Sequence, residues 1–361
     1  MKVAILGSGN GGCAMAADWS LHGHEVSLFD FEQFTTQLDA INNNGGIYVE
    51  GELEGFAELD YVGHSIEKAI EHAELIVLVG PAYSTQPFAE ALKPHIKKGQ
   101  HVIVCPGSTG GGLVVKKELN LAFDDDSIII AETSTLPYAT RNIEPGKVYI
   151  YNRLKGGLYI AALPMDKTAF MMEQFDQIYQ AFEASDHYFQ TMLQNANPVI
   201  HPAVSLLNAG RIDNPDVDFL FYEEGVTPSV GRLVEATDNE RIKIGKTLGV
   251  NVLPDTLIGV RQGYMLEADY ETGYSKAPGF KGVMAPPQLD NRYINEDVGY
   301  GLVFMKELAD KLNLETPIID SIINIASVVM KRDFWGEKRR SLALLGLEGL
   351  TAEELFERFK A

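Results

Sequence analysis

The fold of the first part of the chain is decided by the stretch Val3-Ala4-Ile5-Leu6-Gly7-Ser8-Gly9-Asn10-Gly11-Gly12. An apolar run ends directly in a Gly-x-Gly-x-x-Gly turn, and an alanine-rich helical pattern follows from Cys13 to Leu21. A second apolar run, Glu25–Phe29, stops at Asp30. This order of strand, glycine turn, helix, strand and acid is typical of the start of a dinucleotide-binding domain.

Each glycine of this turn has a separate physical role in such a domain. Gly7 allows the tight turn, Gly9 lets the main chain approach a pyrophosphate, and Gly12 lets the helix pack closely on the strand. The phosphates then accept hydrogen bonds from free N–H groups at the helix N-terminus. The alternative is an ordinary glycine turn in an α/β sheet. The nucleotide contacts predicted from the sequence are Gly7, Ser8, Gly9, Asn10, Gly11, Gly12, Asp30, Pro81 and Thr109.

Asp30 indicates which dinucleotide is expected. It follows eighteen residues after Gly12, close to the spacing expected of an acid that accepts from a ribose hydroxyl. Its charge would repel the 2′-phosphate of NADP(H), and Phe31 and Glu32 supply no cation to receive that phosphate. We therefore expect NAD(H), and NADP(H) is the less favoured alternative.

The composition is that of a globular protein of two domains. The chain has 361 residues, and its net charge of −20 arises from 30 basic and 50 acidic side chains. This charge argues against nucleic acid as a partner. No basic run suits an anionic membrane, and no apolar stretch approaches membrane-spanning length. An anionic substrate must therefore be captured by local cations.

The cysteine content and the N-terminus predict a cytoplasmic location. Cys13 and Cys105 lie in predicted elements of the nucleotide domain and suggest no disulfide framework. The first predicted strand starts near Met1, so no signal peptide is expected.

The first domain, residues 1–185, is predicted to be a Rossmann-type, doubly wound α/β sheet, because strand-like runs alternate with helical patterns such as Ser84–Ile96. Two hairpins are expected to extend it. One joins Ile47–Val49 to Phe56–Leu59, and the other joins Lys147–Asn152 to Leu158–Leu163 through Lys155-Gly156-Gly157. The predicted strands are Val3–Leu6, Glu25–Phe29, Leu75–Val79, His101–Cys105 and Ser127–Ala131.

The second domain, residues 186–361, is predicted to be mainly helical and to bind substrate. Asp166 is expected to cap a helix just before it, and strand signals fade after about Ser185. Thr351-x-x-Glu354 is a capping box that opens the last helix. The other helices expected in this domain are Pro202–Ala209, Arg232–Leu248, Glu296–Leu312 and Ile318–Met330.

Among eight histidines, His201 is the candidate acid/base. Pro198 and Pro202 bracket it, and Pro202 suits the first turn of a helix that runs on to Ala209. A histidine just before a helix is well placed to project from a rigid element. It could equally be a simple N-cap or a hydrogen-bonded core histidine.

The run Asp290-Asn291-Arg292-Tyr293-Ile294-Asn295-Glu296-Asp297 supplies the other candidates. Arg292 could bind a substrate carboxylate through two N–H bonds. Asp297 could orient an imidazole and stabilise its protonated form. The alternative is that Asp290, Glu296 and Asp297 are first-turn acids favoured by the helix dipole.

Two further turns follow predicted strands, where such sheets bind ligands. The residues 106–112, Pro-Gly-Ser-Thr-Gly-Gly-Gly, are expected to line the nicotinamide side, and Gly80-Pro81-Ala82 is placed in the same way. Either could be only a strand-to-helix turn. The sequence contains no Cys/His pattern for a metal and no serine-hydrolase elbow.

Taken together, these pieces resemble the opine dehydrogenase family, also called the octopine/nopaline dehydrogenase family, over nearly the whole chain. Ser108 departs from the pattern, because many members carry an arginine there. The stretches that carry the resemblance are residues 7–12, Cys105–Gly111, Glu132–Ala139, Asn197–Pro202, Arg292–Val298, Gly346–Thr351 and Ala352–Leu355.

This resemblance implies an enzyme that joins an amino acid to a 2-oxo acid, such as pyruvate, by reductive condensation with NAD(P)H. It implies that His201 and Asp297 are the catalytic pair and that Arg292 binds the substrate carboxylate. Two alternatives stay open: a 2-oxo acid reductase of the ketopantoate reductase type, and a non-catalytic NAD(H)-sensing protein. The expected partners are small-molecule amino acid and 2-oxo acid substrates, and a homodimer is the expected assembly.

Overall fold

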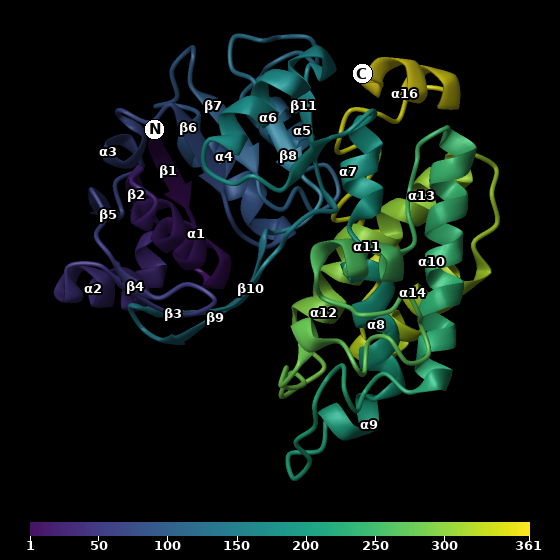
Figure 1. Cartoon of the computed structure of the whole chain (residues 1–361). Helices are drawn as coiled ribbons and strands as arrows, with labels where there is room; N and C mark the ends of the chain where they lie inside the picture. The colour runs from purple at the N-terminus through teal and green to yellow at the C-terminus, as the bar shows by residue number, and fades with distance from the viewer. The chain divides into compact units, whose positions relative to one another are not determined.

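The computed structural model describes residues 1–361, which form two compact units (Figure 1). One unit comprises Met1–Ser185 together with Ala361, and the other comprises Asp186–Lys360. No helix in either unit combines the length and the apolar character needed to cross a membrane.

The first unit is built on an eight-stranded sheet in the order β12-β11-β8-β7-β6-β1-β2-β5. All neighbours in this sheet are parallel except β11 and β8, which are antiparallel. This confirms the predicted doubly wound α/β sheet, although the expected strand Ser127–Ala131 begins and ends later, as β8. The strands are β1 Lys2–Leu6, β2 Glu25–Phe29, β5 Tyr61–Gly63, β6 Leu75–Leu78, β7 His101–Val104, β8 Ile130–Thr133, β11 Leu158–Leu163 and β12 Phe182–Ala184.

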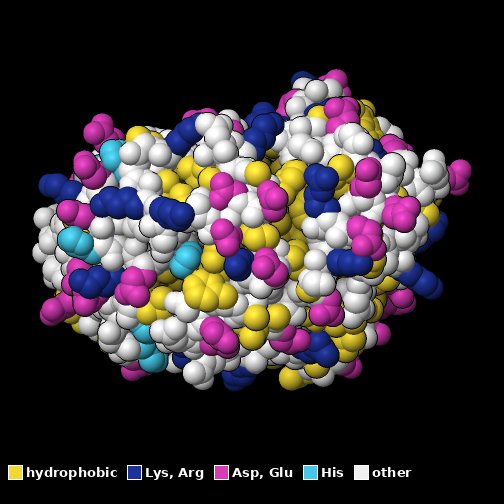
Figure 2. Space-filling model, turned by 90° about the horizontal axis from the view of Figure 1, so that it is seen from above, with side chains coloured by type: hydrophobic (Ala, Val, Ile, Leu, Met, Phe, Trp, Pro, Cys, Tyr) yellow, Lys and Arg dark blue, Asp and Glu magenta, His cyan; other side chains and the backbone are white.

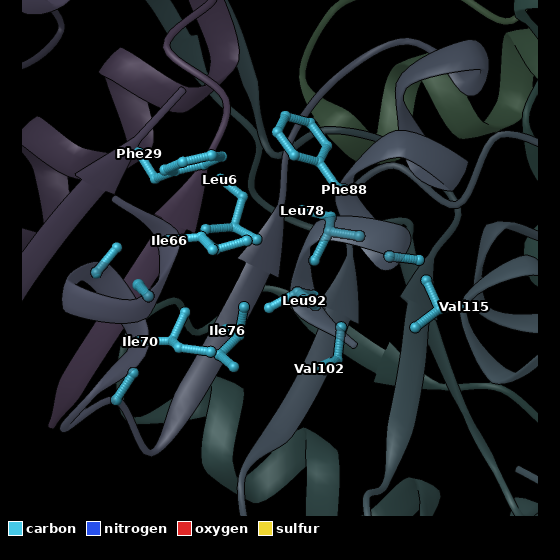
Figure 3. Close-up of a cluster of buried hydrophobic side chains, with 14 of the residues drawn as sticks. Leu6, Phe29, Ile66, Ile70, Ile76, Leu78, Phe88, Leu92, Val102 and Val115 are labelled. Atoms are coloured by element: carbon cyan, nitrogen blue, oxygen red, sulfur yellow. The ribbon is translucent and has the colours of Figure 1, made fainter. Parts of the chain in front are cut away.

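One face of this sheet packs against three helices, α3 (Ile66–Ile70), α4 (Thr85–Leu92) and α5 (Gly111–Glu118). Every second strand residue points to this face, as the period of two requires. Figure 3 shows Leu6, Leu78 and Val102 directed toward side chains of α3 and α4. The apolar contacts on this face fix the carboxyl ends of the parallel strands in place.

A second, four-stranded sheet has the order β4-β3-β10-β9. Its strands are β3 Ile47–Gly51, β4 Gly55–Ala57, β9 Tyr138–Glu144 and β10 Lys147–Arg153. The predicted hairpin of β3 and β4 is confirmed.

The second predicted hairpin is wrong. The antiparallel partner of β10 is β9, through Pro145-Gly146, whereas β11 pairs with β8 and β12 in the larger sheet. A proline followed by a glycine with φ +75° is a strong turn signal. The segment Lys155-Gly156-Gly157 instead carries the chain from one sheet to the other.

Helix α1 (Asn10–Leu21) contacts strands of both sheets. Its residues from Gly12 to Trp19 are all buried, which explains the alanine-rich sequence without a polar face. The buried carboxylate of Asp18 accepts from the Tyr138 hydroxyl at 2.6 Å and pairs with Arg153 at 3.0 Å. The Arg153 charge balances the enclosed carboxylate, and the Tyr138 hydroxyl donates a hydrogen bond to it.

Two other helices complete the first unit, α2 (Thr35–Asn44) and α6 (Thr168–Asp176). The prediction that Asp166 caps a helix is wrong. Asp166 lies inside a short 3-10 turn, Met165–Lys167, and makes no capping hydrogen bond. Pro164 is the N-cap of this turn, and α6 begins directly after it at Thr168. The first unit's other 3-10 segments are Glu32–Phe34 and Ala82–Ser84.

The second unit is helical, as predicted, and contains no strand. Its last helix opens with the predicted capping box of Thr351 and Glu354. Its 3-10 turn is Pro278–Phe280 and its π-helical segment is Asp297–Leu302. Its helices are α7 Tyr188–Gln194, α8 Asn197–Leu207, α9 Ala209–Ile212, α10 Pro228–Leu248, α11 Asp255–Gln262, α12 Arg292–Asn295, α13 Val303–Lys311, α14 Pro317–Met330, α15 Phe334–Glu337 and α16 Ala352–Phe359.

On the face of the molecule seen in Figure 2, charged side chains are spread out rather than gathered in one place. Figure 2 shows acidic, basic and hydrophobic side chains interspersed over one face. The net charge of −20 is therefore not the product of a single acidic patch on this face.

Candidate functional site

The glycine turn after β1 has the geometry predicted for it. A Cβ on Gly7, whose φ is +119°, would lie 2.1 Å from the Val79 carbonyl oxygen. A Cβ on Gly12 would lie 1.8 Å from the Gly7 carbonyl oxygen. In contrast, a Cβ on Gly9 would meet nothing within 4 Å. The protein itself therefore requires Gly7 and Gly12, whereas Gly9 borders open space that a ligand can approach.

The N-terminus of α1 is suited to an anion. Gly9 is the N-cap and supplies no side-chain hydrogen bond, and the first turn contains no acidic residue. The first N–H groups and the positive end of the helix dipole therefore face that open space. Asn10 is held in place because its Oδ1 accepts from the Asn142 N–H at 2.9 Å. These features fit the pyrophosphate of a dinucleotide.

Asp30 follows β2 and fixes the glycine turn. Its Oδ2 accepts from both the N–H and the hydroxyl of Ser8, each at 2.7 Å, and its Oδ1 accepts from the Phe31 N–H at 2.8 Å. The side chain is nearly buried. Asp30 therefore holds the turn in shape, in addition to the ribose contact predicted for it.

Pro81 and Thr109 come from two other strand ends at the same edge of the sheet. They follow β6 and β7, which are parallel to β1. The strand order reverses at β1, because β2 and β5 follow on one side of it and the chain then crosses to β6 on its other side; such a switch point is where open α/β sheets bind ligands. Three consecutive residues, Ser108, Thr109 and Gly110, have positive φ, so the Thr109 turn is unusually tight.

In the second unit, His201 lies inside a helix rather than before one. Helix α8 starts at Asn197, with Pro198 in its first turn and Pro202 one turn later. The prediction that Pro202 opens the helix is therefore wrong. Pro198 takes the position that prolines favour, and the helix continues through Pro202 with the loss of one N–H donor.

Both ring nitrogens of the buried His201 have partners. Its Nδ1 lies 2.7 Å from Asp297 Oδ2, and its Nε2 lies 3.0 Å from the Tyr222 hydroxyl. The ring stacks on Tyr293 with 3.9 Å between centroids and 21° between planes. His201, Asp297 and Tyr222 are each at most 6% exposed. The imidazole is therefore fixed in position and orientation.

Asp297 is the first residue of a distorted stretch of backbone. The expected helix Glu296–Leu312 is divided into a π-helical segment, Asp297–Leu302, and α13. A Cβ on Gly301 would lie 2.3 Å from the Pro198 side chain, so only glycine allows this segment to pack so closely on α8. Such π-segments are frequent at functional sites because they redirect side chains.

Arg292 lies one turn before Asp297, on α12. Its side chain is 52% exposed, and its ion pair with Glu296 is long, at 3.9 Å. Its Cζ lies 5.8 Å from the centroid of the Tyr293 ring. The guanidinium is therefore beside the His201 cluster with donors available for a carboxylate.

The structure brings His201, Asp297 and Arg292 together within the second unit. Sequence reasoning assigned no role to Tyr222 or Tyr293. Tyr293 lies inside the candidate run Asp290–Asp297. Tyr222 follows Phe221 in an irregular segment without any periodic signal. No group of three or more His, Cys, Asp or Glu side chains is arranged to hold a metal ion.

Two protein families match the chain, one in each part. Residues 2–110 match the N-terminus of NAD-dependent glycerol-3-phosphate dehydrogenase. Residues 184–330 match the alpha-helical domain of NAD/NADP octopine/nopaline dehydrogenase. Both descriptions are of NAD- or NADP-dependent dehydrogenases.

Similarity to individual proteins extends over the whole chain. Opine dehydrogenase from Arthrobacter sp. (strain 1C) is 36% identical over 97% of this chain and 96% of its own. A solved octopine dehydrogenase in complex with NADH and agmatine has a TM-score of 0.78 at 18% identity, and the match covers 100% of this chain and 99% of that one. A ketopantoate reductase from Ralstonia eutropha JMP134 has a TM-score of 0.60 at 20% identity, with 94% and 100% covered. The overall fold alone therefore does not separate these two chemistries.

Proposed function

This chain belongs to the opine dehydrogenase family, and from that premise we propose that it condenses an amino acid with a 2-oxo acid such as pyruvate. It is an NAD(P)-dependent oxidoreductase that acts on CH–NH donors. The product would be an N-(carboxyalkyl) amino acid, and the reverse reaction would oxidise it. The single observation that carries the proposal is the buried pair of His201 and Asp297 beside the half-exposed Arg292.

The residues of the first unit would hold the dinucleotide. The N–H groups at the start of α1 would bind the pyrophosphate beside Gly9, and Asp30 would accept from the adenosine ribose while it keeps the Ser8 turn in shape. Pro81 and Thr109 would border the nicotinamide at the neighbouring strand ends. When bound, the reduced nicotinamide supplies the hydride for the reduction.

The residues of the second unit would manage the proton transfers. Arg292 would bind the carboxylate of a substrate through two parallel N–H bonds. Asp297 accepts from Nδ1–H of His201 and orients the ring, so that the imidazole would take a proton from the substrate ammonium group and return it when the carbinolamine loses water.

The test is a screen of NADH oxidation with pyruvate against all common amino acids, with the products identified by mass. We expect oxidation that requires both substrates and a product that contains both carbon skeletons. Oxidation with a 2-oxo acid alone would favour a reductase of the ketopantoate type. Tight NADH binding without turnover on any pair would favour an NAD(H)-sensing protein.

We also predict that the enzyme prefers NADH to NADPH, forms a homodimer and is located in the cytoplasm. Kinetics with both cofactors and gel filtration of the purified chain test the first two directly.

A further inference from the structure

The nitrogen of His201 that could face a substrate is occupied by a second side chain. A carboxylate can only accept hydrogen bonds, so Nδ1 carries a proton toward Asp297. In the neutral ring, Nε2 is then the acceptor, and the Tyr222 hydroxyl donates to it over 3.0 Å. A substrate proton can reach the imidazole either through this phenol or after the phenol has moved away.

The surroundings of Tyr222 favour a fixed ring. The ring stacks on Phe280, with 4.1 Å between centroids and 14° between planes, and Phe280 stacks in turn on Tyr264. The backbone before it is anchored because the Phe221 N–H donates to the Val283 carbonyl at 2.7 Å. Tyr222 is 6% exposed. Moving it away from His201 would break this stack.

The phenol carries a proton at neutral pH. Burial raises the pKa of Tyr222 well above its ordinary value, and Tyr293 acts in the same direction, so the hydroxyl is protonated when it faces Nε2. Arg292 borders the same cluster, because its Cζ lies 5.8 Å from the centroid of the Tyr293 ring, which stacks on His201. A carboxylate held by Arg292 would therefore lie at the cluster that contains this hydroxyl.

We propose that Tyr222 is the terminal proton donor of the site and that His201 acts on the substrate through it. This inference rests on the proposed function, because it concerns the loss of water from the carbinolamine. The Tyr222 O–H proton passes to the carbinolamine hydroxyl while the C–O bond breaks. The nitrogen lone pair forms the C=N bond, and water leaves.

In the same event the Nε2–H proton of the imidazolium passes to the Tyr222 oxygen, so the phenol is restored and the ring becomes neutral. His201 has gained that proton earlier from the substrate ammonium group, along the same path in reverse. No phenolate persists, because Nε2 lies 3.0 Å from the phenol oxygen and returns a proton to it as the phenol loses its own. Asp297 stabilises the imidazolium in the interval.

The test compares Tyr222→Phe with wild type. Phenylalanine keeps the ring in its stack and removes only the hydroxyl. We expect kcat for the condensation to fall by about 100-fold, the low end of the effect of a lost general acid. The NADH dissociation constant should stay within about two-fold. The solvent deuterium isotope effect on kcat should rise, because proton transfer becomes limiting.

Tyr264→Phe is the matched control, because it removes a hydroxyl from the same aromatic stack at a ring without a direct contact to His201. Its kcat should stay close to that of wild type. The double variant Tyr222→Phe with His201→Ala should be no slower than the slower single variant, since both residues serve one proton path.

Two outcomes overturn the inference. If Tyr222→Phe retains or exceeds wild-type kcat, the phenol only covers Nε2, and His201 acts on the substrate directly while the proposed function stands. If wild type itself shows no NADH oxidation that depends on an amino acid, the proposed function fails, and the relay fails with it.

Discussion

Replacing Asp297 with asparagine would keep the shape of the side chain and remove the charge that faces His201. In the structure the carboxylate Oδ2 lies 2.7 Å from Nδ1, and both side chains are at most 6% exposed. The low exposure means that water cannot replace the lost charge. An asparagine could also turn its NH2 group toward Nδ1, which would force the proton onto Nε2 and reverse the hydrogen bond to Tyr222.

The expected loss follows from these contacts. A hydrogen bond to a charged group contributes about 1.5–3 kcal/mol, which corresponds to roughly 10- to 150-fold in rate. The wrong imidazole tautomer would increase this loss of rate. In the histidine–aspartate pair of a serine protease, replacing the aspartate with asparagine lowers kcat by about 10⁴-fold. We therefore expect Asp297→Asn to lower kcat by about 100-fold or more.

The assay is the initial rate of NADH oxidation with saturating pyruvate and amino acid, together with a fluorescence titration of NADH. The affinity for NADH should not change, because the predicted nucleotide contacts belong to the first unit. Asp310→Asn is the matched control, since this aspartate is exposed on α13 and lies outside the His201 cluster. Its rate should equal that of wild type.

A loss of less than three-fold for Asp297→Asn would refute the reasoning. Independent, multiplying losses in the double variant with His201→Ala would also contradict it, because residues that act as one unit should not lose activity additively.

Four further predictions concern substrate capture, cofactor choice, acid stability and packing. Arg292→Lys should lower kcat/KM for a carboxylate substrate by roughly 10- to 150-fold with NADH affinity unchanged, because lysine cannot bind a carboxylate through two parallel N–H bonds. A kcat/KM unchanged from wild type for both the amino acid and the 2-oxo acid would reject this role. Asp30→Ala should weaken NADH binding, because the glycine turn loses its acceptor, and should narrow the preference for NADH over NADPH; steady-state kinetics with both cofactors decide this. Burial lowers the pKa of His187 to about 4, so between pH 6.5 and 4 the unfolded chain binds a proton that the folded chain does not. Up to about 3 kcal/mol of stability should therefore be lost as the pH falls through this range. Urea unfolding at several pH values measures this, and the same dependence of the unfolding free energy on pH in wild type and His187→Gln would contradict it. Gly301→Ala should lower both Tm and kcat, because its Cβ would meet a proline of α8 at 2.3 Å, whereas Gly349→Ala, with nothing within 4 Å, should change neither.

The sequence by itself determined the features whose physical cause is local. Gly7 is required locally by its φ of +119° and Gly12 by a contact with the Gly7 carbonyl oxygen in the same turn, and the alternation of strands and helices follows from hydrophobic periodicity. The capping box of Thr351 and Glu354 likewise spans a single helical turn. The assignment of His201, Asp297 and Arg292 to one site came from resemblance to a family, because nothing local in the sequence joins them.

Only the tertiary structure decided which distant segments meet. Strand β10 pairs with β3, about a hundred residues earlier, and with β9 rather than with β11. This pairing depends on how whole sheets pack around α1. The Nδ1 of His201 meets Asp297 across 96 positions, through a π-helical segment that no periodicity predicts. Tyr222 reaches Nε2 from an irregular segment held by aromatic stacking. Such contacts depend on the free energy of packing the entire unit, so no short stretch of sequence contains them.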